Sequence, residues 1–173
     1  GEDEPYEHNP MLGYRGIRRS LDTPDLFSYE LQAFSKLFDM GYDNIEIMFP
    51  LVNDARDVLP AVRLMEAAGI DVEKCTWGVM IETPGSALMI EDLLDSGIKF
   101  ASFGTNDLTQ YTLAVDRNNA KVADRFDELH PAILKLISPV IQACNNRSVE
   151  TSICGQAGSK PAMVRYLVSC GIS

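Results

Sequence analysis

The sequence predicts an α/β protein with a parallel sheet, because short apolar runs alternate along the chain with amphipathic segments. Four runs have the length and composition of strands that are covered on both faces: residues 44–50, 77–82, 99–104 and 150–155. Strands that alternate with helices in this way lie parallel. A doubly wound sheet and a (β/α)8 barrel both fit the alternation. A complete barrel usually needs about 250 residues, and this chain has 173.

The first three elements are a helix, a strand and a second helix. The first helix has Thr23 as its N-cap, Pro24 at its first position and Gly41 as its terminator. The strand at 44–50 stops at a proline, and the second helix is expected over 53–69 despite the proline inside it. The residues expected to face inward are Leu26, Phe27, Leu31, Phe34, Leu37 and Phe38 on the first helix, and Val58, Leu59, Val62 and Met65 on the second.

The second half of the chain repeats the order of strand and helix. Further helices are expected over 84–97, over 132–145 and from residue 159 or 160 onward. Thr83 and Pro84 open the first of them, Gly97 closes it, and Pro139 predicts a kink in the second. The residues expected to face inward are Ile133, Leu136, Ile137, Val140 and Ile141 on the second, and Val164, Leu167 and Val168 on the last.

Composition and charge exclude several classes of protein. The net charge of −10 argues against a nucleic-acid partner, because phosphate backbones are bound by Lys and Arg. No run approaches the roughly 18 apolar residues of a membrane span, and the acidic residues 1–10 do not resemble a signal peptide. We therefore expect a cytoplasmic protein. The spacing of Cys75, Cys144, Cys154 and Cys170 matches no zinc or CxxC motif, and all but Cys154 are expected to be buried hydrophobic residues.

Polar residues follow three of the expected strands at their carboxyl ends. Glu82 ends the second strand, Asn106 and Asp107 follow the third, and Cys154 ends the fourth. Ligands of parallel α/β folds bind at this edge of the sheet, and barrel enzymes place their catalytic residues there. Glu82 and Asp107 can together hold Mg²⁺ and leave positions open for substrate oxygens. Such a metal would stabilise an enolate as a Lewis acid.

The remaining polar residues suit an anionic substrate. Arg15 and Arg117 can bind a phosphoryl group or a carboxylate. Asn106 and the backbone amides near Gly104 and Thr105 can add to this binding. Cys154 can move a proton to or from carbon on the face away from the metal.

Each of these residues also has a structural interpretation. Glu82 is also suited to the N-terminus of a helix as a favourable negative charge, Asn106 and Asp107 are typical helix caps, and a lone cysteine such as Cys154 is typically a buried thiol. Arg15 stands in a cluster of arginines that suits a solvated surface, and Arg117 can pair with Asp116 or Asp124. His8 and His130 are expected to be structural, with His130 at the start of a helix.

Four segments of the chain resemble the phosphoenolpyruvate-utilising enzymes. Residues 103–117, FGTNDLTQYTLAVDR, are similar to the signature of that family. NPMLGYRGIR, VMIETPGSAL and SICGQAGS resemble its other blocks and stand in the family's order. The family includes phosphoenolpyruvate synthase (pyruvate, water dikinase), pyruvate phosphate dikinase and enzyme I of the sugar phosphotransferase system. Within the family, the chain is most similar to the synthase branch. The acidic segment before Asn9 indicates that branch, and so does Gln156, at a position where enzyme I usually has an acidic residue.

The resemblance implies a (β/α)8 substrate domain that binds phosphoenolpyruvate and pyruvate. It implies Glu82 and Asp107 as ligands of Mg²⁺, for which Mn²⁺ can substitute, and Cys154 as the acid/base at the methyl carbon. The residues implied to contact the substrate's phosphoryl and carboxylate groups are Arg15, Gly104, Thr105, Asn106 and Arg117. In the full-length enzyme, ATP, pyruvate and water would give AMP, phosphoenolpyruvate and phosphate, a gluconeogenic reaction, with a phosphohistidine carrying the phosphoryl group to the pyruvate enolate.

The chain has neither the family's phosphohistidine domain nor its nucleotide-binding domain. We therefore expect residues 1–173 to be a fragment of the barrel, about strands three to seven, that cannot complete turnover from ATP. Its two exposed strand edges predict self-association, as a homo-oligomer. Two other interpretations remain open at this point: a metal-dependent aldolase or lyase acting on a pyruvate enolate, and a folded piece without activity.

Overall fold

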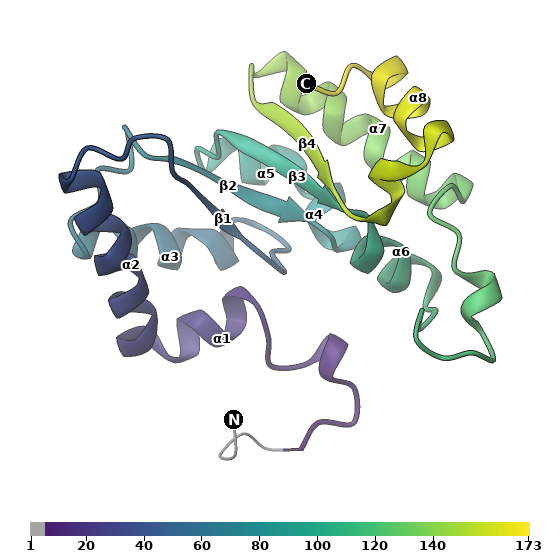
Figure 1. Ribbon diagram of the computed structural model, residues 1–173, viewed down its shortest axis with the longest axis horizontal. Coiled ribbons are helices and arrows are strands. Elements are labelled where there is room, and N and C mark those ends of the chain that lie inside the picture. The colour runs from purple at the N-terminus through teal and green to yellow at the C-terminus, as the bar shows by residue number, and fades with distance from the viewer. Residues whose placement is uncertain (1–5) are drawn as a thin grey trace.

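A computed structural model describes residues 6–173 and shows an α/β fold with one parallel sheet (Figure 1). The sheet has four strands in the order β1-β2-β3-β4. The strands are β1 (Glu46–Phe49), β2 (Thr76–Ile81), β3 (Phe100–Gly104) and β4 (Glu150–Cys154). All four lie where the sequence predicts them. Parallel neighbours in chain order, each joined to the next through helices, form a continuous segment of a (β/α)8 barrel.

Eight α-helices and three short 3₁₀ helices are found among residues 6–173. The α-helices are α1 (Ile17–Asp22), α2 (Pro24–Asp39), α3 (Ala55–Ala67), α4 (Pro84–Leu88), α5 (Ile90–Asp95), α6 (Thr105–Leu113), α7 (Pro131–Asn146) and α8 (Pro161–Cys170). The 3₁₀ helices are η1 (Pro10–Leu12), η2 (Ala123–Arg125) and η3 (Gln156–Ser159). The helix expected over 84–97 is thus divided at Met89 into α4 and α5. The helix α7 continues through Pro139.

The ends of two helices show which capping predictions hold. Gly41 terminates α2 as expected: it has φ +88°, and the Tyr42 N–H donates to the Leu37 carbonyl. Thr23 stands at the N-cap position of α2, but its hydroxyl donates to the Arg19 carbonyl of the preceding turn and leaves α2 uncapped by a side chain. At the start of α4, Thr83 forms a capping box with Ser86.

Four apolar residues expected to face inward are exposed in the structure. They are Leu26, Leu59, Val164 and Val168, with exposed fractions of 50%, 43%, 41% and 65%. Each is adjacent in sequence to a buried residue of the same helix. Leu26 precedes the buried Phe27, and the other three follow the buried residues Val58, Met163 and Leu167. Consecutive residues of an α-helix point about 100° apart. A narrow buried stripe therefore accepts one member of each pair and leaves the other in solvent.

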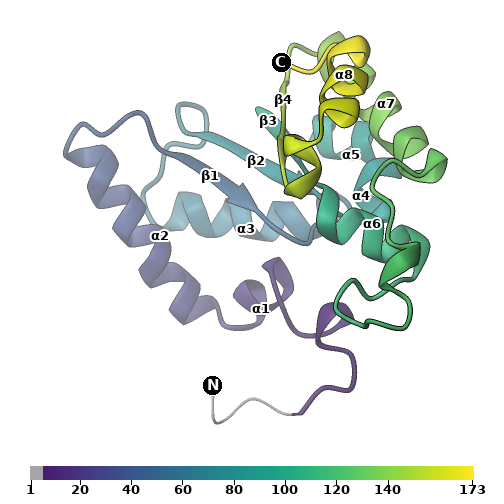
Figure 2. The ribbon, with the colours of Figure 1, turned by 45° about the vertical axis from the view of Figure 1, so that its right-hand side comes forward.

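Helices cover one face of the sheet and leave the other face open. The covered face carries the apolar core of the strands, which includes Phe49, Trp77, Val79, Ile81 and Phe103. In Figures 1 and 2, α3, α5 and α7 follow this side of the sheet. The open face carries both polar and apolar side chains, and a hollow there is lined by Glu46, Met48, Phe100, Ser102, Glu150, Thr151, Ser152 and Ser173. This is the face that points inward in a closed barrel.

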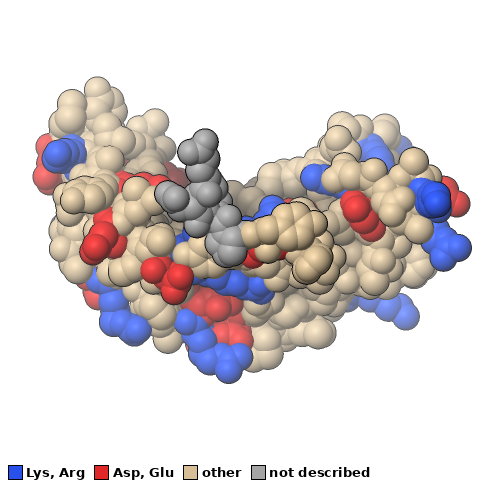
Figure 3. Space-filling model, turned by 90° about the horizontal axis from the view of Figure 1, so that it is seen from below, with Lys and Arg blue, Asp and Glu red and all other residues tan. Residues whose placement is uncertain are grey.

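The segment that contains η1 contacts α6. The Tyr111 hydroxyl of α6 donates to the carbonyl of Met11 in η1. In Figure 3, which shows the molecule from below the view of Figure 1, Lys and Arg are interspersed with Asp and Glu. No helix within residues 6–173 combines the length and apolar character that crossing a membrane requires.

Candidate active site

The structure brings the predicted residues together at the carboxyl edge of the sheet. Glu82 directly follows β2, Asn106 and Asp107 lie in the first turn of α6, and Cys154 ends β4. The strand register pairs Ile81 with Phe103 and Gly104 with Cys154. The ends of β2, β3 and β4 therefore lie side by side, as the sequence predicts.

Glu82 is a buried carboxylate, with 5% of its surface exposed. Its Oε1 accepts a hydrogen bond of 2.6 Å from the Leu51 N–H, in the loop after β1. Burial raises the pKa of Glu82 from 4.5 to about 7. The Leu51 N–H and the positive charge of Arg15 oppose this rise in pKa, whereas the neighbouring Asp107 carboxylate adds to it.

Gly104 makes room for the Glu82 side chain. A Cβ atom at Gly104 would lie 2.8 Å from Glu82 Cβ, 2.9 Å from Met80 Sδ and 3.0 Å from Glu82 Oε2. Any larger residue at the end of β3 would displace the carboxylate. The close approach of a neighbouring side chain therefore requires glycine at this position of the motif. The backbone conformation does not, because any residue can adopt its φ of −85°.

Asp107 leaves a buried oxygen without a donor. Its Oδ1 is inaccessible to solvent and has no hydrogen-bond partner among residues 6–173. Asp107 lies close enough to Glu82 for its charge and a side-chain hydrogen bond to raise the pKa of Glu82 beyond the effect of burial. Two adjacent carboxylates with an unsatisfied oxygen are suited to a hard divalent cation. No cluster of three or more His, Cys, Asp or Glu side chains that could hold a metal occurs in the described part of the chain. Two carboxylates fill only part of the coordination shell of such a cation.

Arg15 and Tyr111 complete the charged side of the site. Arg15 lies between η1 and α1. Burial raises the pKa of both Glu82 and Tyr111, and the positive charge of Arg15 partly offsets each rise. The charges of Asp107 and Glu82 raise the pKa of Tyr111 further. Tyr111 was not predicted from the sequence. The signal that could have found it is its position four residues after Asp107, which places both on one face of α6.

Arg117 returns to the site from the loop after α6. Its backbone N–H donates to Gln110 Oε1 at 3.3 Å. Its guanidinium Nη1 lies 2.9 Å from one of the two terminal atoms of the Asn106 amide. A guanidinium only donates hydrogen bonds, so the neighbours of the amide assign this atom as the oxygen. The guanidinium thus lies against the amide of the motif, and neither Asp116 nor Asp124 is needed to hold it.

Cys154 lies half-buried at the end of β4, next to Gly104. The following Gly155 has φ +146°, and a Cβ there would lie 2.4 Å from Thr105 Oγ1. The backbone after Cys154 is therefore pressed against the beginning of α6, which only glycine permits. This contact brings the thiol to the same edge as the carboxylates.

The other cysteines and the histidines lie outside this cluster. Cys75 and Cys144 are buried as predicted, whereas Cys170 is half-buried, because it stands in the last turn of α8. Burial raises the pKa of the Cys144 thiol to about 11. His130 has the predicted structural role: it is the N-cap of α7, and its ring accepts a hydrogen bond of 3.1 Å from the Ala132 N–H. His8 is exposed.

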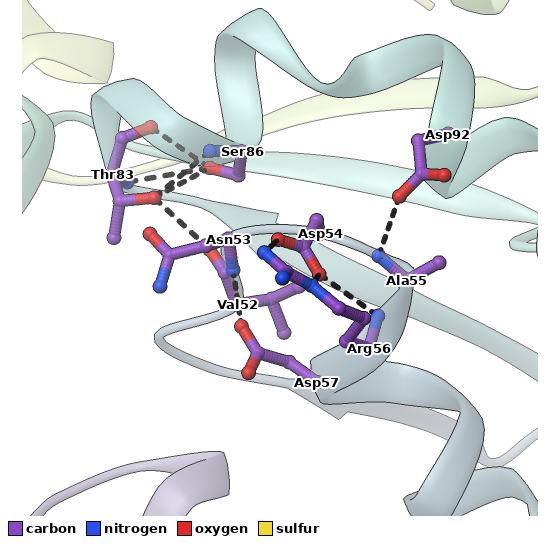
Figure 4. A network of polar contacts seen from close by, with 9 residues as sticks. All are labelled: Val52, Asn53, Asp54, Ala55, Arg56, Asp57, Thr83, Ser86 and Asp92. Atoms are coloured by element: carbon purple, nitrogen blue, oxygen red, sulfur yellow. Dashed lines mark hydrogen bonds and ion pairs between the residues drawn. The ribbon is translucent and has the colours of Figure 1, made fainter.

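The loop that supplies the Leu51 N–H is held by a network of polar contacts, shown in Figure 4. The Thr83 hydroxyl at the start of α4 donates to the Val52 carbonyl at 3.0 Å. The Ala55 N–H donates to Asp92 of α5 at 2.8 Å. Further bonds within the loop and α3 join Asn53 to Asp57 and Arg56 to Asp54. The network fixes this loop against α4 and α5, and so holds the Leu51 amide on the carboxylate that ends β2.

Comparisons with known proteins identify the family of the chain. Residues 1–173 match the family described as PEP-utilising enzyme, PEP-binding domain. The phosphoenolpyruvate synthase of Pyrococcus furiosus is 57% identical over an alignment of 173 positions, which covers 99% of this chain and 21% of that protein. The probable phosphoenolpyruvate synthase of Methanocaldococcus jannaschii is 53% identical, over 99% of this chain and 15% of that protein. A phosphoenolpyruvate-dependent phosphotransferase system protein of Salmonella typhimurium is 39% identical, over 95% of this chain and 23% of that protein.

This chain therefore spans about a fifth of the length of these relatives. Among solved structures, an HpcH/HpaI aldolase/citrate lyase family protein of Burkholderia cenocepacia is similar, with a TM-score of 0.52 and 18% identity. The likeness covers 72% of this chain and 55% of that one. At this level of identity it bears on the fold alone, and it agrees with a partial barrel.

Proposed function

Because this chain belongs to the phosphoenolpyruvate-utilising enzymes and matches their phosphoenolpyruvate-binding domain, we propose that it is the substrate domain of a phosphoenolpyruvate synthase. In the proposed reaction of the longer protein, a phosphohistidine of another domain transfers its phosphoryl group to the enolate of pyruvate. ATP, pyruvate and water would then give AMP, phosphoenolpyruvate and phosphate. The higher identity to synthases (57% and 53%) than to the phosphotransferase system protein (39%) supports this branch over enzyme I.

The observation that carries the proposal is the pair of carboxylates at the ends of β2 and β3. Glu82 is buried with a raised pKa, and Asp107 has a buried oxygen without a donor. Both features suit Mg²⁺ or Mn²⁺, and we propose Glu82 and Asp107 as its ligands. A bound cation would supply Lewis-acid stabilisation of negative charge on the substrate oxygens.

The other side chains have distinct proposed roles toward the same substrate. Arg15 and Arg117 lie on the charged side of the cluster and would bind the carboxylate and phosphoryl groups. Thr105, Asn106 and the Gly104 backbone, where β3 meets α6, would add hydrogen bonds to them. The positive end of α6 also favours an anion at this point.

Cys154 is the proposed acid/base group. It ends β4 beside Gly104 and is half-buried, so its thiol can reach a substrate that lies over the end of β3. The proton would move between the Cys154 Sγ and the methyl carbon of pyruvate, which becomes the methylene carbon of phosphoenolpyruvate. In this role Cys154→Ala should retain ligand binding and lose exchange of the pyruvate methyl protons with D₂O, followed by proton NMR in the presence of Mg²⁺.

The experiment that tests the proposed function is calorimetry of oxalate binding with and without Mn²⁺. Oxalate has the planar shape and charge of the pyruvate enolate, and Mn²⁺ replaces Mg²⁺. We expect the unmodified chain to bind oxalate only with Mn²⁺, and Asp107→Ala to abolish this binding. Asp25→Ala removes an exposed carboxylate at the start of α2 and should bind as the unmodified chain does. Metal-independent binding, or equal binding by Asp107→Ala, would contradict the proposed site.

A further inference from the structure

Glu128 is a buried acidic residue that lies outside every motif of the site. It stands in the loop between η2 and α7, and only 1% of its surface is exposed. Its Oε2 accepts a hydrogen bond of 2.6 Å from Lys160 Nζ, at the start of α8. Its Oε1 faces the first turn of α6, where it accepts a hydrogen bond of 3.4 Å from Thr105 Oγ1 and lies 3.2 Å from a terminal atom of the Asn106 amide.

The ion pair with Lys160 does not explain the burial of Glu128. Lys160 has 49% of its side chain exposed, so the same pair could form at the surface without desolvating the carboxylate. Removing a carboxylate from water is costly unless its oxygens receive other hydrogen bonds. Here those bonds come from Thr105 and Asn106, two residues of the substrate-binding motif.

Glu128 determines which way the Asn106 amide points. An ionised carboxylate only accepts hydrogen bonds, and a guanidinium only donates them. Asn106 lies between one of each, with Glu128 on one side and Arg117 on the other. The amide therefore donates from nitrogen to Glu128 Oε1 (3.2 Å) and accepts at oxygen from Arg117 Nη1 (2.9 Å).

The opposite orientation of the amide is unfavourable. It would keep one contact of 3.4 Å from the Gln156 N–H to the Asn106 oxygen. It would also place that oxygen against Glu128 Oε1 and the amide nitrogen against Arg117 Nη1, so that two acceptors and two donors face each other. Two good hydrogen bonds outweigh one long contact.

We propose that Glu128 is a positioning residue, which orients the Asn106 amide and through it holds the Arg117 guanidinium toward the substrate. Glu128 does not itself touch the substrate. The inference depends on the proposed function only in naming what Arg117 binds, the phosphoryl or carboxylate group of phosphoenolpyruvate. In this proposal Glu128 acts on Arg117 only through Asn106. That dependence gives a test that separates a positioning role from general support of the fold.

The first measurement needs no ligand, and it uses a variant only to assign the signal. The side-chain amide of Asn106, labelled with ¹⁵N and assigned by its loss in Asn106→Ala, is followed by NMR. We expect one amide proton, bonded to Glu128, to be shifted downfield and to exchange slowly with solvent. Fast exchange of both protons, as at the exposed Asn118, would overturn the inference.

The second measurement is the affinity for phosphoenolpyruvate with Mn²⁺ in a double-mutant cycle. Glu128→Leu keeps the volume but removes the acceptor, and the half-exposed Lys160 can turn to solvent. We expect Glu128→Leu and Asn106→Ala each to weaken binding about tenfold, and the double variant to be no weaker than Asn106→Ala alone. Glu150→Leu makes the same change of charge at an exposed residue and should bind as the unmodified chain does.

The outcomes separate this inference from the proposed function. If Glu128→Leu binds as the unmodified chain does, or if its effect adds to that of Asn106→Ala, Glu128 does not act through Asn106. If the unmodified chain binds no phosphoenolpyruvate, the proposed function fails. The exchange of the Asn106 amide then decides the role of Glu128 by itself.

Discussion

The buried carboxylate Glu82 predicts that the metal-free chain becomes more stable when its charge is removed. In Glu82→Gln the side-chain oxygen can still accept the Leu51 N–H, and the amide nitrogen can donate to Asp107. The substitution removes only the cost of ionising a buried group beside another carboxylate. The same change is expected to abolish cation binding, so stability and function oppose each other at this position.

The magnitude follows from the pKa of Glu82, which is 4.5 in the unfolded chain and about 7 in the folded one. Because the folded state holds the proton more tightly, the free energy of unfolding falls as the pH rises from 4.5 to 7. The stabilisation is complete below this window and lost above it. At about 1.4 kcal/mol per pKa unit, the loss is about 3 kcal/mol. Glu82→Gln has no such loss. Between pH 4.5 and pH 8, its free energy of unfolding should therefore rise by about that amount relative to that of the unmodified chain.

The assay is urea unfolding in EDTA at pH 4.5 and pH 8, followed by the fluorescence of Trp77, the only tryptophan of the chain and a buried one. Glu46→Gln, which changes an exposed acid at the start of β1, is the control and should show no such pH dependence. Replacing the EDTA with Mg²⁺ at pH 8 should stabilise the unmodified chain and leave Glu82→Gln unchanged. The reasoning is refuted if Glu82→Gln is less stable at pH 8, or if its difference from the unmodified chain is the same at both pH values.

Three further predictions concern packing and reactivity. Gly104→Ala would place Cβ 2.8 Å from Glu82 Cβ. It should lower the free energy of unfolding by about 1–3 kcal/mol and abolish Mn²⁺-dependent oxalate binding. Unchanged oxalate affinity in calorimetry would contradict this. Thr83→Val loses the hydrogen bond to the Val52 carbonyl and the cap of α4; urea unfolding should show a loss of about 1–2 kcal/mol, and a variant as stable as the unmodified chain would argue against the network. The buried Cys144 thiol, with its pKa raised to about 11, should resist maleimide at pH 8 while the half-buried thiol at the end of β4 reacts, as mass spectrometry of the peptides can show; equal labelling would be inconsistent with the fold.

Much of the fold could be predicted from local pattern. The four strands, the stop of α2 at Gly41 and the start of α7 at His130 follow from apolar runs, glycine and proline, whose effects act within a few residues. The shared edge of Glu82, Asp107 and Cys154 was also predictable. In a parallel sheet all carboxyl ends lie on one side, so residues that follow strands must meet there.

Other features depended on contacts between distant segments. The sequence placed Leu59 on the inner face of α3, but only the position of the helix on the sheet decides which of two adjacent apolar residues is buried. Tyr111 and Glu128 carried no local signal strong enough to single them out. Glu128 reaches Asn106 across a separation of more than twenty residues, through a loop whose path is set by packing.

The sequence by itself determined which residues end the strands and hence which chemical groups gather at one edge of the sheet. The tertiary structure decided their electrostatic state. The raised pKa of Glu82 arises from burial and from the approach of Asp107, and the orientation of Asn106 arises from an acceptor on one side and a donor on the other. Both are properties of distances between segments far apart in the chain, and desolvation and charge interaction depend on those distances rather than on residue order.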